Sequence, residues 1–290
     1  MKKAFVLFLI LLMCCGTALG EDTQRVFHVG EAPAFSSDEE LLEVYVCPLG
    51  GADCALLMVP GQSMMVDLGK STDVPVILGM LRWLGVSHVD IVFNSHPHSD
   101  HIGGTAGLLK SCTFGVFMTA YPEDYKGDGV YQVNNMNALR EAHVPIQHVD
   151  NGDIFPLGPA SCTVMRRDIS NPNVNQTSAM LMVQYGECRL LLTGDVFGIA
   201  LQHLAEEYDV KADIMKYPHH GIDTISPIFI REVAPEFAYF THATRGSEKG
   251  QQSLYWFGVP YDFATEGILH FSTNGEYWLI ERLPYNLLSI

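Results

Sequence analysis

The sequence has little positive charge. Its 290 residues contain 17 Lys and Arg against 33 Asp and Glu, which gives a formal net charge of −16, and the basic residues form no cluster. Such a chain is repelled on average by polyanions such as DNA, teichoic acid and anionic lipid. The composition therefore argues against a long basic binding track. A bound metal ion can reverse the field locally, so an anionic substrate is not excluded.

Several other features are missing. No repeat of fixed period, low-complexity tract or Pro/Gly/Ser-rich linker divides the chain. A G-x-S-x-G motif and a C-x-x-C pair are absent too, which argues against a serine nucleophile of that type and against a dithiol redox site. With 48% hydrophobic residues, a chain of this length can bury one large core.

The one long apolar run lies at the N-terminus. Two lysines precede "AFVLFLILLM", and "ALG" (18–20) has small residues where signal peptidase reads the chain. We predict a signal peptide at residues 1–20 and a secreted or cell-envelope protein with no stable membrane span after cleavage. A lipoprotein modified at Cys14 or Cys15 is the alternative. The run is too short to predict a transmembrane helix.

Five cysteines remain after cleavage at Gly20. Cys47 and Cys54 flank "PLGGAD" and could form a disulfide in an oxidising compartment. The alternative is that all five are small buried hydrophobic residues. They are Cys47, Cys54, Cys112, Cys162 and Cys188.

Alternating strand and helix signals follow an extended lead-in at 21–40 and predict one domain over 41–290. We expect strands at 41–46, 54–59, 63–69, 89–94, 162–167, 178–186, 188–194, 212–217 and 236–242, and a final hairpin that turns at Asn274-Gly275. We expect helices at 73–85, with Asp73 as the cap, and at 102–110, 130–143, 198–210 and 225–233. Two mixed runs of strands with helices predict an α/β fold built as an αββα sandwich.

The strongest motif is "NSHPHSDHIGG", which follows the apolar run "VDIVF". His96 and His98 are two residues apart, so their side chains point the same way if the chain stays extended. Asp100 and His101 lie at the turn into the next helix and can face a second point. Imidazole and carboxylate ligands suit Zn²⁺, and Mn²⁺ is also possible. The motif predicts two adjacent divalent ions that share a hydroxide and clamp a phosphoryl or carbonyl oxygen.

Two later segments repeat this arrangement of a buried strand followed by polar groups. "LLLTGD" ends in Asp195, and "DIMKYPHHG" ends in His219, His220 and a glycine. Taken singly, Asp195 could be a helix cap and the histidine pair could be incidental. All three segments place a polar side chain after a strand and before a glycine or a helix. We therefore predict that they form one site.

These motifs resemble those of the metallo-β-lactamase superfamily. More narrowly, they are similar to the branch formed by the extracellular domain of ComEC competence proteins and the teichoic-acid phosphorylcholine esterases. The resemblance covers about 41–282 and includes "GGADCALLMVPGQSMMVDLG" and "NQTSAMLMVQYGECRLLLTGD". It implies an αββα sandwich with two mixed β-sheets flanked by helices.

The resemblance also implies roles for single residues. Six would bind two metal ions: His96 and His98 the first, Asp100, His101 and His220 the second, and Asp195 both. His219 would contact a phosphoryl oxygen or act as an acid, and Asp100 and Asp195 would join it in catalysis. The choice between His219 and His220 as the ligand stays open, with His220 preferred because it adjoins Gly221.

One departure from the wider superfamily concerns the first metal ion. Many members have a further His shortly before the bridging Asp, but here that segment reads "NPNVNQTSAM". His143 and His148 lie earlier, in what the pattern predicts to be a different turn. Asn175 and Ser178 match the N-x-x-S pattern of the ComEC-like branch. The first ion is therefore expected to have an incomplete protein shell, which argues against β-lactamase or glyoxalase activity.

Other residues have weaker signals. Asp67 in "MMVDLG" is expected to orient a ligand His through a hydrogen bond, with a turn-forming Asp as the alternative. Asp53 in "GGAD" is interpreted as a structural turn residue. His242 and Arg245 are candidates for lining the pocket, and 119–132 is a candidate lid.

The sequence thus predicts a secreted metal-dependent hydrolase, a phosphodiesterase or phosphoesterase. Its substrate would be a small or surface-displayed phosphoester rather than long DNA, because the chain is acidic. One alternative is a lactonase or a β-lactamase-type amide or ester hydrolase. A non-catalytic binding protein on the same fold is the other.

Overall fold

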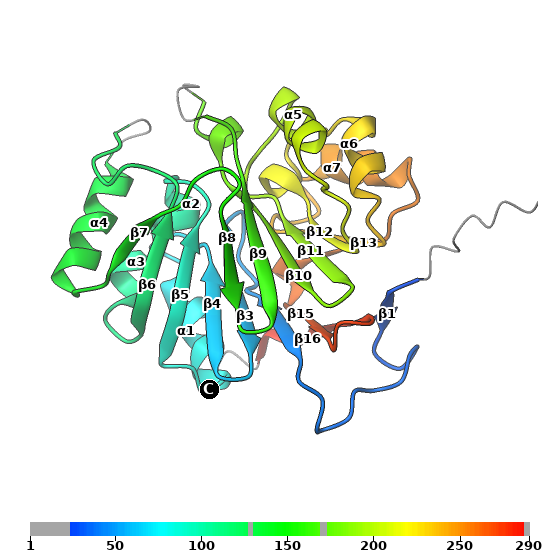
Figure 1. Ribbon diagram of the computed structural model, residues 1–290, viewed down its shortest axis with the longest axis horizontal. Helices are drawn as coiled ribbons and strands as arrows, with labels where there is room; N and C mark the ends of the chain where they lie inside the picture. Colours follow the sequence, from blue (N-terminus) through cyan, green and yellow to red (C-terminus); the bar gives the residue numbers. More distant parts are fainter. Residues whose placement is uncertain (1–23, 127–129, 169–172, 287–290) are drawn as a thin grey trace, which may run out of the picture.

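Two facing β-sheets with helices on their outer sides make up this computed structural model (Figure 1). The structure describes residues 24–126, 130–168 and 173–286. The predicted signal peptide lies outside these residues, as does the start of the lead-in. Within the described part, no helix is both long and apolar enough to cross a membrane.

The first sheet has nine strands and is mixed. The strands β4 to β7 are parallel, whereas β2, β3, β4, β15 and β16 pair antiparallel. In spatial order they are β1 (Val26–His28), β16 (Trp278–Leu283), β15 (Ile268–Thr273), β2 (Leu42–Val46), β3 (Ala55–Val59), β4 (Gln62–Val66), β5 (His88–Asn94), β6 (Thr113–Thr119) and β7 (Ile146–His148).

The second sheet has seven strands and is also mixed. Here β11 to β14 are parallel and β8 to β11 are antiparallel. In spatial order they are β14 (Tyr261–Phe263), β13 (Phe237–Phe240), β12 (Ile214–Lys216), β11 (Cys188–Leu192), β10 (Met180–Tyr185), β9 (Ala160–Met165) and β8 (Ile154–Leu157).

Three apolar clusters hold the layers together. The central cluster lies between the sheets and includes Phe93 from one sheet and Leu181 from the other. A second cluster joins the outer face of the first sheet to its helices, and a third does the same for the second sheet. Because both sheets are covered on both faces, strands such as "ALLMV" are apolar throughout rather than alternating. The predicted αββα sandwich is confirmed.

The helices belong to one sheet or the other. Those over the first sheet are α1 (Val74–Trp83), α2 (Ser99–Ile102), α3 (Thr105–Leu108) and α4 (Tyr131–Glu141). Those over the second are α5 (Ile199–Glu207), α6 (Pro227–Val233) and α7 (Glu248–Tyr255). Three short 3-10 turns complete the fold: η1 (Asn175–Thr177), η2 (Pro218–Gly221) and η3 (Ala264–Glu266).

Some local predictions were incomplete or wrong. The lead-in, which was expected to be extended, contains β1. Five other elements were not predicted: β6, β7, β8, β14 and α7. All of them except β6 are short or polar and leave a weak periodic signal. Asp73 precedes α1, but its side chain does not cap that helix. Its carboxylate instead accepts a hydrogen bond from the Lys70 backbone N–H at 2.9 Å.

All five described cysteines are buried and free, in agreement with the alternative of small buried hydrophobic residues. The backbone N–H of Cys47 donates to the carbonyl of Cys54, so the two residues face each other across the start of a hairpin. Contact with the Cys47 thiol and burial raise the pKa of Cys54. Burial alone raises the pKa of Cys162 to about 12.

Candidate metal centre

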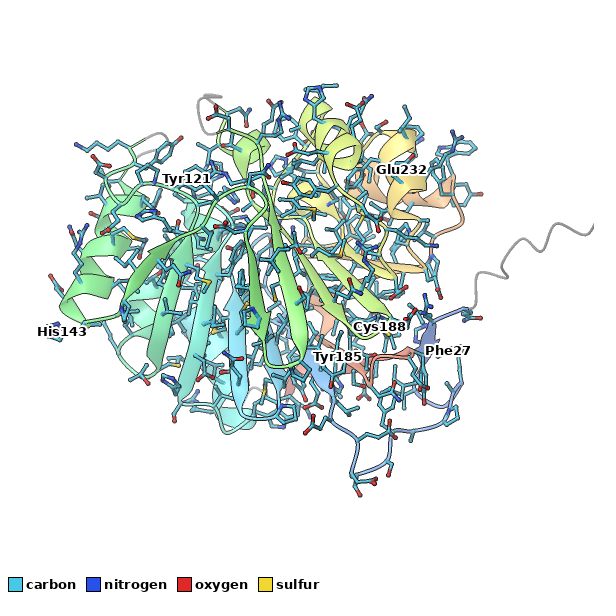
Figure 2. All side chains as sticks on the ribbon, in the orientation of Figure 1. Phe27, Tyr121, His143, Tyr185, Cys188 and Glu232 are labelled. Carbon is cyan, nitrogen blue, oxygen red and sulfur yellow. The ribbon has the colours of Figure 1, made fainter. Side chains whose placement is uncertain are left out.

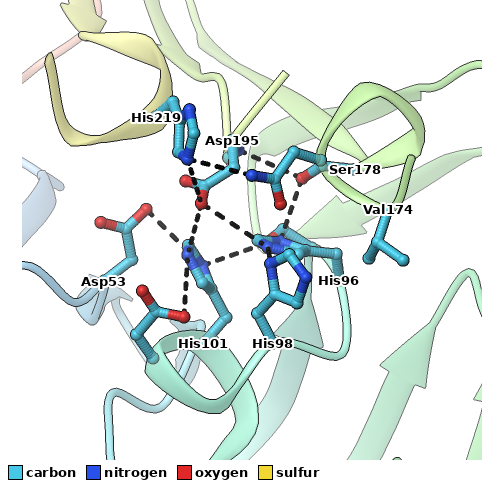
Figure 3. A network of polar contacts seen from close by, with 12 residues as sticks. Asp53, His96, His98, His101, Val174, Ser178, Asp195 and His219 are labelled. Atoms are coloured by element: carbon cyan, nitrogen blue, oxygen red, sulfur yellow. Dashed lines mark hydrogen bonds and ion pairs between the residues drawn. The ribbon is translucent and has the colours of Figure 1, made fainter. Parts of the chain in front are cut away.

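The predicted ligands meet where parallel strands of both sheets end. Asp67 follows β4 directly, and His96 comes two residues after β5. Asp195 follows β11, and His220 follows β12. Ligand sites commonly form at the carboxyl ends of strands in α/β sheets, because the loops from neighbouring strands converge there. Figure 3 shows His96, His98 and His101 gathered on one side of Asp195.

The first donor group consists of His96, His98 and Asp195, whose donor atoms all lie within 4.8 Å of one another. His96 Nε2 is 3.6 Å from Asp195 Oδ2 and 2.9 Å from His98 Nδ1. On the other side of the ring, His96 Nδ1 is 3.2 Å from Ser178 Oγ. Ser178 Oγ also accepts the backbone N–H of Asp195 at 3.2 Å, so this serine links two of the three donors.

The second donor group consists of Asp53, His101, Asp195 and His220 and includes the same oxygen of Asp195, with Asp100 beside it. His101 Nε2 is 3.2 Å from Asp195 Oδ2, and His220 Nε2 is 3.4 Å from it. Asp100 Oδ2 is 3.5 Å from His220 Nε2. Asp195 Oδ2 faces both groups, so this carboxylate is a donor that the two groups share.

Carboxylates behind the histidines orient the rings. Asp67 Oδ2 is 2.7 Å from His101 Nδ1, and the same side chain accepts hydrogen bonds from Ser95 and Asn94. Asp53 Oδ1 is 3.1 Å from His220 Nδ1. A carboxylate on one ring nitrogen fixes the tautomer and turns the other nitrogen toward the centre. Asp67 thus has the orienting contact predicted for it.

The residues present fit divalent metal ions. The Nε2 atoms of His101 and His220 and the Oδ1 atom of Asp195 are buried without a hydrogen-bond partner among the described residues. Buried polar atoms are rarely left unpaired, and imidazole nitrogens converging on a carboxylate are a donor set for a transition metal. The His/Asp cluster of this fold is therefore suited to divalent cations.

Charge leads to the same conclusion. The carboxylates of Asp53, Asp67, Asp100 and Asp195 surround the centre. The Lys216 ammonium lies 2.7 Å from Asp53 and 3.9 Å from Asp195. Burial lowers the pKa of His220, but Asp195 and Asp53 outweigh burial and raise this pKa to about 10. The same carboxylates likewise outweigh burial and raise the pKa of His101, whereas burial lowers that of His96. Without metal, protons on His101 and His220 therefore offset the excess negative charge. A divalent cation would replace those protons.

The two adjacent histidines of "PHHG" face different surroundings. Both have left-handed backbone angles, with φ of 47° at His219 and 53° at His220. His220 is 4% exposed and faces Asp100 and Asp195. His219 lies on the more open side, with Nδ1 2.7 Å from Asp223 Oδ2 and Nε2 3.0 Å from Asn175 Nδ2. The next residue must be glycine, since a Cβ on Gly221 would lie 2.4 Å from Phe240.

The structure brings together every residue assigned to the centre from sequence: His96, His98, Asp100, His101, Asp195, His219 and His220, with Asp67, Asn175 and Ser178 beside them. Two other histidines lie elsewhere. His143 is at the end of α4 near the edge of the molecule (Figure 2), and His148 lies on β7 near Glu123. Within the described residues, no third His joins the first donor group.

The structure gives no support for His242 and Arg245 as residues that line the pocket. His242 is half-buried with its ring close to Gly51 and Gly246, and Arg245 is exposed. The contacts that join the candidate ligands include neither of them. In the candidate lid, the Tyr121 hydroxyl is 2.8 Å from Thr177 Oγ1, which ties the described start of this loop to η1. Residues 127–129 of the loop lie outside the described residues, so the lid stays a prediction.

Three residues at the centre were missed or misinterpreted. Asp53 was interpreted as a structural turn residue, but it is buried at the centre against His220 and Lys216. Lys216 carried a signal, since a charged residue in the apolar strand "IMK" requires a partner. Asp223 had no signal, because its contact with His219 depends on the turn between them.

Cavities near and away from the centre differ in size. A cavity of about 20 Å³, room for about one water molecule, lies behind the ligands and is lined in part by Asp53, Asp67 and Lys216. A cavity of about 730 Å³ is lined in part by His148 and Arg166 and contains none of the candidate ligands. Its volume alone does not make it the reaction site.

Comparisons with known proteins agree with this fold. The family model Lactamase_B, described as the metallo-beta-lactamase superfamily, matches residues 47–242. The metallo-beta-lactamase fold protein YhfI from Bacillus subtilis is 14% identical, with a TM-score of 0.54 over 81% of this chain and 100% of that chain. A Parabacteroides distasonis protein, assigned provisionally to the metal-dependent hydrolases, is 13% identical, with a TM-score of 0.51 over 77% and 94%.

A third similar structure belongs to a protein with a different activity. CmlA, a diiron beta-hydroxylase from Streptomyces venezuelae, is 11% identical, with a TM-score of 0.51 over 86% of this chain and 55% of that chain. At these identities the three structures support the fold alone. No curated protein has a significantly similar sequence.

Proposed function

This chain belongs to the metallo-β-lactamase superfamily, and we propose that it is a secreted phosphodiesterase or phosphoesterase that uses two divalent metal ions. The family, the fold and the His/Asp cluster support a metal-dependent hydrolase. We place it in the branch of the ComEC extracellular domain and the teichoic-acid phosphorylcholine esterases. The observation that carries the proposal is the pair of donor groups that share Asp195 Oδ2.

The ligands divide between two ions. His96, His98 and Asp195 would hold the first, and Asp100, His101, His220 and Asp195 the second. Two divalent cations held there, Zn²⁺ or Mn²⁺ by donor type, would supply Lewis-acid stabilisation of a phosphoryl group. The chain adds His219, whose Nδ1 is held by Asp223 and whose Nε2 contacts Asn175 Nδ2 at 3.0 Å. On substrate binding, Nε2 would exchange this contact for a phosphoryl oxygen or give a proton to the leaving group.

Ser178 favours the phosphoester over the amide alternative. It contacts His96 Nδ1 at the point where the wider superfamily has another His ligand, so the first group has only three protein donors. The open positions suit substrate oxygens as ligands. A lactonase or β-lactamase-type hydrolase is the alternative, and it is favoured by the superfamily match alone.

The substrate and location follow from charge and the N-terminus. A net charge of −16 favours a small or surface-displayed phosphoester over long DNA. The lysines and apolar run of residues 1–20 support export. N-terminal sequencing of the exported protein should start at Glu21, and a cytoplasmic protein with Met1 intact would contradict export.

The test is hydrolysis of bis(p-nitrophenyl) phosphate by the chain from Glu21, loaded with Zn²⁺ or Mn²⁺. We expect turnover that Asp195→Ala abolishes together with metal binding, because the variant lacks the shared ligand. Asp38→Ala, an exposed aspartate in the lead-in, is the matched control and should behave as wild type. No turnover with either metal would move the proposal to lactones and β-lactams, and intact turnover in Asp195→Ala would contradict the bridging role.

A further inference from the structure

Lys216 is a charged side chain buried in the second sheet. It ends β12, where all three residues are buried, and only 3% of its surface is exposed. Removing an ammonium group from water costs several kcal/mol unless it is paired and hydrogen-bonded. The partners of Lys216 therefore indicate what this side chain does.

The ammonium group has three close acceptors. Lys216 Nζ is 2.7 Å from Asp53 Oδ2, and it donates to the carbonyl oxygens of Gly194 at 2.8 Å and Tyr217 at 3.4 Å. An ammonium has three N–H donors, so this set uses all of them. Gly194 directly precedes Asp195, and Asp53 contacts His220. Lys216 thus reaches His220 through Asp53, and it reaches Asp195 both through Gly194 and by a longer ion pair of 3.9 Å to Asp195 Oδ1.

Asp53 could act in two ways. Its carboxylate lies within the second donor group, so it could itself be a ligand. However, Oδ1 is 3.1 Å from His220 Nδ1, and Oδ2 is held by Lys216. His220 Nδ1 also contacts Thr241 Oγ1 at 2.8 Å, which leaves Nε2 to face Asp100 and Asp195. Each oxygen of Asp53 thus faces a basic group at ion-pair distance, Oδ1 the His220 ring and Oδ2 the Lys216 ammonium, which favours a role in orienting His220.

The pair also connects the two sheets. Asp53 lies in the turn between β2 and β3 of the first sheet, and Lys216 lies in β12 of the second. The adjoining cavity of about 20 Å³ has room for about one water molecule, so solvent offers little replacement for a lost partner.

We propose that Lys216 is a positioning residue for the second metal ion. It holds Asp53 against His220 Nδ1, while its hydrogen bond to Gly194 fixes the turn that carries Asp195. This proposal rests on the metal-binding part of the proposed function and is independent of the substrate.

The test measures Zn²⁺ binding rather than turnover. Lys216→Met keeps the length of the side chain and removes its charge. After dialysis, Zn²⁺ content and competition with a chromophoric chelator give the affinity of each ion. We expect the second ion to bind about 10–100-fold more weakly, as for other losses of a residue behind a ligand. The first ion should weaken less, because it shares only Asp195 with the contacts of Lys216. Lys110→Met, an exposed lysine, is the matched control and should keep both ions.

A second background identifies the ion that is lost. His98→Ala removes a ligand of the first group only. We expect His98→Ala with Lys216→Met to retain no tightly bound ion, because the two changes act on different groups. One tight ion retained in this double variant would overturn the assignment to the second group.

Further outcomes also decide the question. Unchanged affinity for both ions in Lys216→Met, or loss of both from the folded variant, would overturn the proposal. If Lys216→Met does not fold, Asp53→Asn with Lys216→Met removes both buried charges and is expected to fold. That variant must also lose the second ion, and retention of two ions would overturn the proposal. Failure of wild type to bind Zn²⁺ would instead contradict the proposed function.

Discussion

Single side chains at the centre owe their roles to backbone direction more than to residue type. His219 and His220 are adjacent and identical, yet one faces Asp100 and Asp195 while the other lies beside Asp223 and Asn175. Their left-handed angles separate the two rings. Such angles in residues other than glycine cost on the order of 1–3 kcal/mol and persist where the surrounding structure enforces them.

His219→Ala should lower turnover and leave metal content near that of wild type. His219 Nε2 is 3.9 Å from Asp195 Oδ2, farther than the Nε2 of His220, and the proposed role of His219 is toward the substrate. Loss of a proton donor of this kind costs about 10²–10⁴-fold in rate. The measurements are kcat on bis(p-nitrophenyl) phosphate and bound metal per chain.

Asp223→Asn supplies the comparison for this prediction. It keeps the size of the side chain and removes the charge that holds His219 Nδ1, so kcat should fall less than in His219→Ala. Loss of metal from His219→Ala would exchange the roles of His219 and His220.

Among the elements, the candidate ligands follow the ends of strands, whereas side-chain contacts between paired strands stabilise the fold. The turns after β5, β11 and β12 present the candidate ligands, and each has a backbone hydrogen bond to a neighbouring segment. After β5, the Ser95 carbonyl accepts a hydrogen bond from the Ala179 N–H. After β12, the His219 N–H donates to the Gly194 carbonyl, which follows β11.

Away from the centre, β2, β15 and β16 share a half-buried ionic contact. His270 Nδ1 is 2.9 Å from Glu281 Oε1, and His270 Nε2 is 3.5 Å from Glu43 Oε1. The His270 ring also stacks on Tyr45 at 4.4 Å.

This contact predicts a pH-dependent stability. Burial lowers the pKa of His270, but Glu43 and Glu281 outweigh burial and raise this pKa above its usual value. A raised pKa in the folded state stabilises the protein fully below the unfolded pKa of about 6.5. That stabilisation is lost as the pH rises through the folded pKa.

His270→Gln should therefore reduce the free energy of unfolding more at about pH 6 than at about pH 9. We expect a loss of about 1.5 kcal/mol at the lower pH, typical of a hydrogen bond to a charged group, and a smaller loss at the higher pH. Urea denaturation at both pH values measures it. His28→Gln, exposed on β1, is the control. An equal loss at both pH values would show that the proton on His270 does not contribute.

For the whole molecule, metal binding at the centre is expected to contribute to the stability of the fold. Three buried carboxylates and the half-buried Asp100 meet between the ends of two sheets that are otherwise held by apolar packing. Chelation of metal should lower the melting temperature, because protons on the histidines replace divalent cations only in part. A ligand at 100 times its dissociation constant stabilises the folded state by about 2.7 kcal/mol.

Differential scanning fluorimetry of the EDTA-treated chain would measure this effect. Zn²⁺ should raise the melting temperature, and Mg²⁺ should raise it less, since Mg²⁺ prefers an all-oxygen octahedral shell. Asp195→Ala should show a much smaller rise with Zn²⁺. An unchanged melting temperature on adding Zn²⁺ to the wild-type chain would contradict a buried binuclear centre.

The sequence by itself determined the layers and the ligand types. Long apolar strands followed by His or Asp are local features, and they predicted both the αββα sandwich and the position of the ligands at strand ends. Short strands such as β7 and β14 left no such signal, because three residues are too few to show a period.

Only the tertiary structure decided how the ligands are held. Asp53 and Lys216 are more than 160 positions apart and meet because one sheet packs on the other. Which of His219 and His220 faces the other candidate ligands depends on their two backbone angles and on a glycine that must fit against Phe240. A local sequence pattern specifies which donor a strand end carries. The direction of that donor depends on contacts from distant parts of the chain.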